Sequence, residues 1–338
     1  MHQQPRKSNF ELLRIIAILG IILHHLVIKG ASTCGYISPY DRSTDGLLGL
    51  IINSCVVGGV NCFILITGWF GISHPLKAFL KIFSETIVYG FISYSFVFAI
   101  TSDFSPKWLF DSIDFRNNWF VNSYFMLLLL QPIIERSLNG IKYEELKKWV
   151  LLLSIFNIVF VFLLRNFNNN GYNVIQFIWL YYIARFLRVG HDRQWYNLLK
   201  KYSISIYLFM VFCLSFGLYC LNFTHKEIKS IVWFGYNQPL VMLLSIALFI
   251  TFAKIGIQSS TVNKLSTGVF GVYVLHTTIH LIPIRNDFAN GIYTEWGYWG
   301  LIVLTVIIFV ICSAISIPCS RVIKKSITTL TETDNIFK

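Results

Sequence analysis

Charged residues are scarce in this sequence, and their scarcity excludes a soluble globular protein. Lysine, arginine, aspartate and glutamate make up 13% of the 338 residues, whereas about 25% is typical of soluble domains. Hydrophobic residues account for 55%, phenylalanine alone occurs 30 times, and the mean hydropathy is +0.62. The chain is therefore predicted to be an all-α, polytopic integral membrane protein with one domain.

Several motifs are absent from the sequence, and their absence excludes further classes of function. The seven cysteines form no C-x-x-C motif and no cluster with histidine at metal-ligand spacing, so the sequence predicts neither a metal site nor a disulfide framework. The first apolar run lacks a small-residue cleavage site, which favours an uncleaved first span. The formal net charge of +12 does not indicate nucleic acid, because the basic residues stand in short loops between apolar runs.

Ten apolar segments are candidates for crossing a bilayer, which takes about 20 residues of helix. We predict a helical bundle of about ten transmembrane helices. The second segment is long, and Gly58-Gly59 is an expected break within it. The predicted spans are 10–28, 47–72, 78–100, 119–135, 149–165, 172–188, 202–222, 237–257, 267–283 and 297–319.

The loops on the two sides of this bundle differ in charge. If the N-terminus is cytoplasmic, 19 of the 28 lysines and arginines belong to the cytoplasmic side and 8 to the other, with Arg14 inside the first span. Cytoplasmic loops of membrane proteins are enriched in these residues. We therefore predict a multi-pass protein of the cell membrane with both termini cytoplasmic. Residues 7–320 would form the transmembrane domain and 321–338 a short cytoplasmic tail.

The first span, which lies in FELLRIIAILGIILHHLVIKG (10–30), holds four ionisable residues. At about 100° per residue, Arg14 and His25 lie within roughly 20° of one another and about 16 Å apart along the axis. Glu11 can pair with Arg14 at i,i+3, and His24 points about 80° away. These side chains could reach the two membrane interfaces, but ionisable groups inside a span usually face a cavity or a partner.

Four stretches, in order, resemble the integral-membrane acyltransferase-3 family. The resemblance covers 7–320 and implies a membrane-embedded O-acyltransferase. Such an enzyme moves an acetyl group from cytoplasmic acetyl-CoA to a hydroxyl of a cell-surface polysaccharide or lipid-linked saccharide. The stretches are N-F-E-L-L-R-I-I-A-x₇-H in the first span, NCFILITGWF (61–70), NWFVNSYFMLLLLQP (118–132) and TGVFGVYVLHTTIH (267–280).

Within that interpretation the first span supplies the principal site residues. Arg14 is suited to the phosphates of acetyl-CoA, since guanidinium binds phosphate bidentately, and Glu11 is its partner in donor binding. His25 is suited to act as a general base on the acceptor hydroxyl or to carry the acyl group covalently. Arg14 and His25 are the predicted catalytic residues. Possible lining residues are His24, Asn61, Thr67, Gly68, Trp119, Tyr124 and His276.

The sequence also departs from the family pattern in two ways. Relatives often have a basic residue soon after the block that Thr67-Gly68 matches, whereas Lys77 is the nearest here. Many relatives carry a fused extracytoplasmic hydrolase-like domain. This chain is expected to be a stand-alone member, surrounded by membrane lipids and assisted by polysaccharide-assembly proteins.

One rival function comes from a different class. A transporter could use Glu, Arg and His inside the membrane as a proton or solute relay. Against this alternative, the sequence has no duplicated halves and no matching pair of broken helices.

Overall fold

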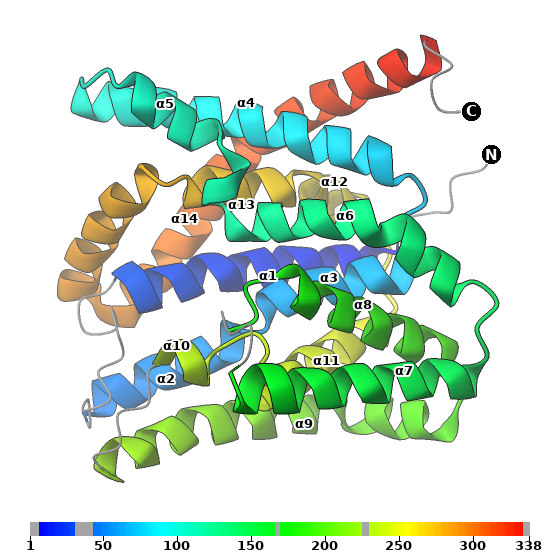
Figure 1. Cartoon of the computed structure of the whole chain (residues 1–338). Coiled ribbons are helices and arrows are strands. Elements are labelled where there is room, and N and C mark those ends of the chain that lie inside the picture. The colour runs from blue at the N-terminus through cyan, green and yellow to red at the C-terminus, as the bar shows by residue number, and fades with distance from the viewer. Residues whose placement is uncertain (1–6, 31–42, 166–169, 225–229, 334–338) are drawn as a thin grey trace.

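The protein is a bundle of helices (Figure 1). The computed structural model describes residues 7–30, 43–165, 170–224 and 230–333, and these contain no β-strand. The all-α prediction is confirmed. The α-helices are α1 (Ser8–His25), α2 (Thr44–Val56), α3 (Gly59–Phe70), α4 (Pro75–Thr101), α5 (Pro106–Ile113), α6 (Trp119–Leu138), α7 (Tyr143–Ile155), α8 (Val174–Val189), α9 (Gln194–Leu221), α10 (Ser230–Trp233), α11 (Pro239–Ala253), α12 (Ser260–Leu265), α13 (Val269–Thr277) and α14 (Leu281–Thr333).

Long apolar helices identify a polytopic membrane protein, as predicted. Each of the ten predicted spans contains helix, although α8, α11 and α13 are shorter than 18 residues. The number of ten crossings stays a prediction. In the described part of the chain, six helices are long and apolar enough to span a bilayer: Ser8–Ile28, Thr44–Phe70, Pro75–Thr101, Tyr143–Leu163, Gln194–Leu221 and Leu281–Thr329.

The expected break in the second span lies between α2 and α3. α2 ends at Val56 and α3 begins at Gly59. A Cβ on Gly58 would lie 2.7 Å from a side-chain carbon of Leu244, and one on Gly59 would lie 2.8 Å from the carbonyl oxygen of Ala17. Glycine at both positions therefore lets α3 start in close contact with α1 and α11.

The predicted span 267–283 is not one continuous helix. α13 ends at Thr277, and the backbone of Thr278 is extended before α14 begins. Arg285 of α14 is 8% exposed and donates through Nη1 to the carbonyl oxygen of His276 at 2.9 Å. A cation at the end of a helix satisfies carbonyls that have no intrahelical partner. The break after His276 is thus stabilised by a residue from the next helix.

The first part of α14 is separated from the rest of the helix by a kink. It lies across one end of the bundle and meets a kink at Gly297, where φ is 59° (Figure 1). Trp296 and Trp299 beside the kink are 68% and 78% exposed. Tryptophan is enriched at membrane interfaces, so this part of α14 fits an interfacial helix.

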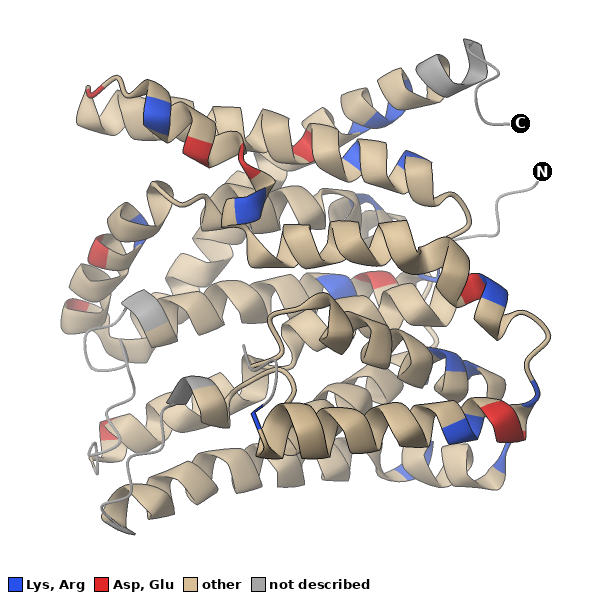
Figure 2. Cartoon of the chain, viewed as in Figure 1, with Lys and Arg blue, Asp and Glu red and all other residues tan. Residues whose placement is uncertain are grey.

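The charges are distributed unevenly between the two ends of the bundle. Lysine and arginine gather at the end where α1 and α4 begin and α14 ends, and fewer lie at the opposite end (Figure 2). This is the asymmetry from which the orientation was predicted.

Candidate active site

Glu11 and Arg14 of α1 line a cavity of about 480 Å³, which is called the main cavity below because it contains these two predicted site residues. Arg14 Nη1 donates to Glu11 Oε1 at 2.5 Å, as the i,i+3 spacing predicts. Glu11 is 7% exposed and the Arg14 side chain is 29% exposed, so the carboxylate is buried and the guanidinium is half-buried. The other polar lining residues come from α3, α4, α6, the turn before α13, and α13: Thr67, Lys81, Glu85, Tyr124, Ser266, Thr267 and Tyr273.

Lys81 and Glu85 form a second ion pair in this cavity that the sequence analysis did not identify. They lie one turn apart on α4, with Lys81 Nζ 3.6 Å from Glu85 Oε1, and Glu85 is 1% exposed. The available signal was an acid and a base at i,i+4 within an apolar segment, the kind of signal that singled out the first span. The cavity therefore has two cations balanced by two carboxylates.

His25 of α1 and His276 of α13 are in contact, and their hydrogen bonds define their tautomers. His25 Nδ1 lies 3.1 Å from His276 Nε2, and His276 Nδ1 lies 2.7 Å from the carbonyl oxygen of Val272. Because a carbonyl oxygen only accepts, neutral His276 carries its proton on Nδ1 and accepts at Nε2. His25 Nδ1 is then the donor between the rings. The basic nitrogen of the neutral His25 ring is therefore Nε2.

The cavity ends one helical turn short of this histidine pair. Ile21 lines the cavity and precedes His25 by four residues. Tyr273 lines it from the other side, and its ring meets the His276 ring edge to face at 6.0 Å between centroids. Arg14 and His25 are about 16 Å apart along the axis of α1. The site therefore has ion pairs at one end and imidazoles at the other.

Asn118 connects this end of the cavity to α6. The Tyr273 hydroxyl donates to Asn118 Oδ1 at 2.9 Å, and Asn118 Nδ2 donates to Thr277 Oγ1 at 3.1 Å. Asn118 Oδ1 also accepts from the backbone N–H of Val121 at 3.3 Å and so caps α6. These bonds hold the Tyr273 ring between the cavity and His276.

The predicted lining residues Thr67 and Tyr124 do line the cavity, and their hydroxyl oxygens lie 3.4 Å apart. Gly68 has a different position. A Cβ there would lie 2.8 Å from backbone atoms of Tyr181 and 2.9 Å from Cβ of Ala184. The Thr67-Gly68 pair thus combines a cavity hydroxyl with a close approach of α3 to α8.

Three other predicted lining residues, His24, Asn61 and Trp119, are not among the residues that line the cavity. His24 Nδ1 lies 2.6 Å from Oδ1 of Asn53 on α2. Asn61 Nδ2 donates to the carbonyl oxygen of Tyr236 at 3.0 Å, and the Trp119 ring stacks on that of Tyr236 at 5.5 Å. The structure therefore attaches these three side chains to neighbouring helices and loops.

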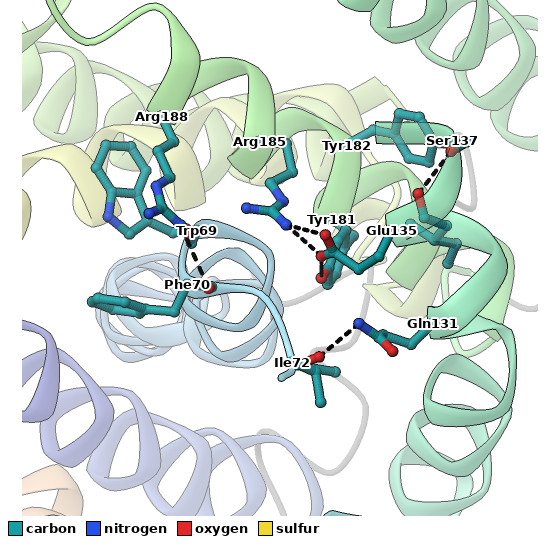
Figure 3. A network of polar contacts seen from close by, with 11 residues as sticks. Trp69, Phe70, Ile72, Gln131, Glu135, Ser137, Tyr181, Tyr182, Arg185 and Arg188 are labelled. Carbon is teal, nitrogen blue, oxygen red and sulfur yellow. Dashed lines mark hydrogen bonds and ion pairs between the residues drawn. The ribbon is translucent and has the colours of Figure 1, made fainter. Parts of the chain in front are cut away.

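A second polar network joins α3, α6 and α8 (Figure 3). The carboxylate of Glu135 accepts from the Tyr181 hydroxyl and pairs with Arg185, so both of its oxygens have partners. Arg188 donates to the carbonyl oxygen of Trp69 at 2.7 Å, which caps the end of α3. A cavity of about 530 Å³ borders this network. The network fixes the end of the helix that carries Thr67.

The fold and the site define a polytopic membrane protein in which a cavity with two ion pairs ends one helical turn short of a histidine pair. Within the described ranges, no three His, Cys, Asp or Glu side chains come together as a metal site. A family model described as an acyltransferase domain, Acyl_transf_3, matches residues 7–320. The chain belongs to this acyltransferase family, and the predicted resemblance is confirmed. No curated protein and no solved structure matches the chain.

Proposed function

We propose that the chain is an O-acetyltransferase of the cell membrane. It moves an acetyl group from cytoplasmic acetyl-CoA to a hydroxyl of a cell-surface polysaccharide or lipid-linked saccharide. The family match favours acyl transfer over the transport alternative. The observation that carries the proposal is the bond between His25 and His276, since it presents a basic nitrogen one turn beyond an ion-paired cavity.

The inner end of the cavity is suited to the phosphates of the donor. α1 and α4 both begin at the end rich in lysine and arginine (Figures 1 and 2). Arg14 and Lys81 each lie six residues into their helices, or about 9 Å by helical rise. Two cations at similar depth are favourable for a diphosphate. Relatives often have a basic residue soon after the block that Thr67-Gly68 matches, and Lys81 could take the place of that residue here.

The histidine end is suited to proton transfer. His25 Nε2 takes the proton of the acceptor hydroxyl while the hydroxyl oxygen attacks the thioester carbonyl carbon. The carbon–sulfur bond then breaks, and His25 returns the proton to the leaving thiolate. His276 holds His25 in the required tautomer and orientation, a role that the aspartate has in Ser-His-Asp triads. In the covalent alternative, the same nitrogen would carry the acetyl group.

The predicted orientation in the membrane is compatible with this arrangement. With both termini cytoplasmic, Arg14 and Lys81 face the compartment that contains acetyl-CoA. The His25–His276 pair then lies in the outer half of the membrane, where a surface saccharide is accessible. Polysaccharide-assembly proteins would deliver that acceptor.

The test is a comparison of O-acetyl signals in surface glycans from cells with and without the protein. We expect the signals to disappear without it and to return with the wild-type chain. They should not return with His25→Ala at equal membrane abundance. Unchanged O-acetylation in the absence of the protein would overturn the proposed function.

A further inference from the structure

Glu85 has a hydrogen-bonding capacity that the protein itself does not satisfy. Its side chain lines the main cavity, and the residue is 1% exposed. Oε1 lies 3.6 Å from Lys81 Nζ, and the Ser320 hydroxyl is close to the carboxylate. In the part of the chain that the structure describes, however, no group lies within hydrogen-bond distance of the buried Oε2. Buried polar atoms are costly without partners. An oxygen in this position is therefore suited to a ligand.

The chemistry of Glu85 restricts what that ligand can offer. An ionised carboxylate only accepts hydrogen bonds, so its partner must carry an N–H or O–H group. The phosphates and the thioester carbonyl of an acyl-CoA are acceptors themselves and do not fit. The arm between them, the pantetheine part, carries two amide N–H groups and one hydroxyl.

We propose that Glu85 binds the pantetheine arm of the donor by accepting a hydrogen bond from its pantoyl hydroxyl or the adjoining amide N–H. This inference rests on the proposed function, because it assumes an acyl-CoA donor. In this proposal α4 binds the arm of the donor, while Arg14 of α1 and Lys81 of α4 bind its phosphates.

Depth along α4 supports this part of the arm rather than another. Lys81, at the level of the phosphates, precedes Glu85 by about 6 Å of helical rise. Ser93 of α4 donates to the carbonyl oxygen of Leu275, next to His276, at 3.3 Å. Ser93 is about 12 Å beyond Glu85. Glu85 thus lies between the phosphate end and the histidine end, nearer to the phosphates, as the pantoyl group does in the donor.

The experiment compares three donors of decreasing length: acetyl-CoA, acetyl-pantetheine and S-acetyl-N-acetylcysteamine, which lacks the pantoyl group. Glu85→Met removes the acceptor at similar volume. We expect kcat/KM to fall roughly tenfold for the two donors that contain the pantoyl group and to change little for the shortest. Glu85→Gln keeps one acceptor oxygen and the shape, and should lose less.

Inhibition gives a second measurement that does not depend on turnover of the shortest donor. Pantetheine and N-acetylcysteamine are tested as competitors of acetyl-CoA. Glu85→Met should weaken inhibition by pantetheine and leave inhibition by N-acetylcysteamine unchanged.

Glu135→Met is the control, because Glu135 is a half-buried carboxylate and both of its oxygens have protein partners. A purely structural loss should lower the use of all three donors by one factor. If Glu85→Met behaves in that way, or has no effect, the proposal is overturned while the proposed function stands. If the wild-type protein uses none of the donors, the proposed function is overturned and this inference with it.

Discussion

The two ends of the candidate site are held by different kinds of contact. At the inner end, Arg14 pairs with Glu11 and Lys81 with Glu85, each within a single helix. At the other end, His25 and His276 are 251 residues apart and join α1 to α13. Pairs within one helix can open by side-chain rotation alone, whereas the histidine contact depends on how two helices pack.

This difference suggests that the two ends have different roles, donor binding at the inner end and proton transfer at the histidine end. The inner end can exchange its internal ion pairs for contacts with a charged donor. Under the proposed function, the histidine end keeps the reacting groups in a fixed geometry, which is what proton transfer requires. Substitutions at the inner end should therefore change mainly KM for the donor, and those at the histidine end mainly kcat.

The largest effect is expected for His25→Ala. Removing the group that takes the hydroxyl proton should lower kcat by roughly 10²- to 10⁴-fold, while the protein still enters the membrane. The measurement is the rate of acetyl transfer at saturating acetyl-CoA, at matched membrane abundance. If His25→Ala raised KM and left kcat unchanged, the proposed division between donor binding at the inner end and catalysis at the histidine end would be contradicted.

His276→Ala should come next, with kcat lower by up to about a hundredfold, because a misplaced base loses rate even when it is present. His276→Gln offers an amide oxygen to His25 Nδ1 and should recover part of the activity. Equal activities of the two variants would argue against a role through the His25 tautomer.

Arg14→Lys tests the inner end. The charge is kept but the fork of donors is lost, so KM for acetyl-CoA should rise roughly tenfold with kcat nearly unchanged. The dependence of the initial rate on acetyl-CoA concentration measures both. A fall in kcat at unchanged KM would instead indicate that Arg14 acts in the chemical step, as proposed for His25.

The smallest effect is expected for His24→Ala. His24 is adjacent to His25 but bonds to Asn53 on α2, so kcat should stay within about twofold. Stability should fall by about 1–3 kcal/mol, since Asn53 would be left with a buried unpaired group. Inactive His24→Ala together with active His25→Ala would show that the assignment of the base is displaced by one residue.

Local spacing in the sequence was enough to predict part of this site. The pairing of Glu11 with Arg14 follows from their separation on one helix, and the break at Gly58-Gly59 follows from residues that are neighbours in the chain. The prediction that Arg14 and His25 share a face of α1 likewise required only the helical repeat.

Contacts between distant segments could not be obtained in this way. The position of Glu85 in the cavity depends on how α4 packs against α13 and α14, which a single apolar pattern does not specify. The early end of α13 depends on Arg285, a residue of the next helix that bonds to the carbonyl of His276. One continuous helix was predicted over 267–283 because apolar residues continue past the end of α13.

The most direct test of the account is acetyl transfer in isolated membranes supplied with radiolabelled acetyl-CoA and surface polysaccharide. Wild-type protein and His25→Ala are compared at matched abundance, and the alkali-labile label in the polysaccharide is counted as O-acetyl ester. We predict label with the wild-type protein and almost none with His25→Ala. Equal label in the two preparations would contradict the assignment of His25 as the group that performs the transfer.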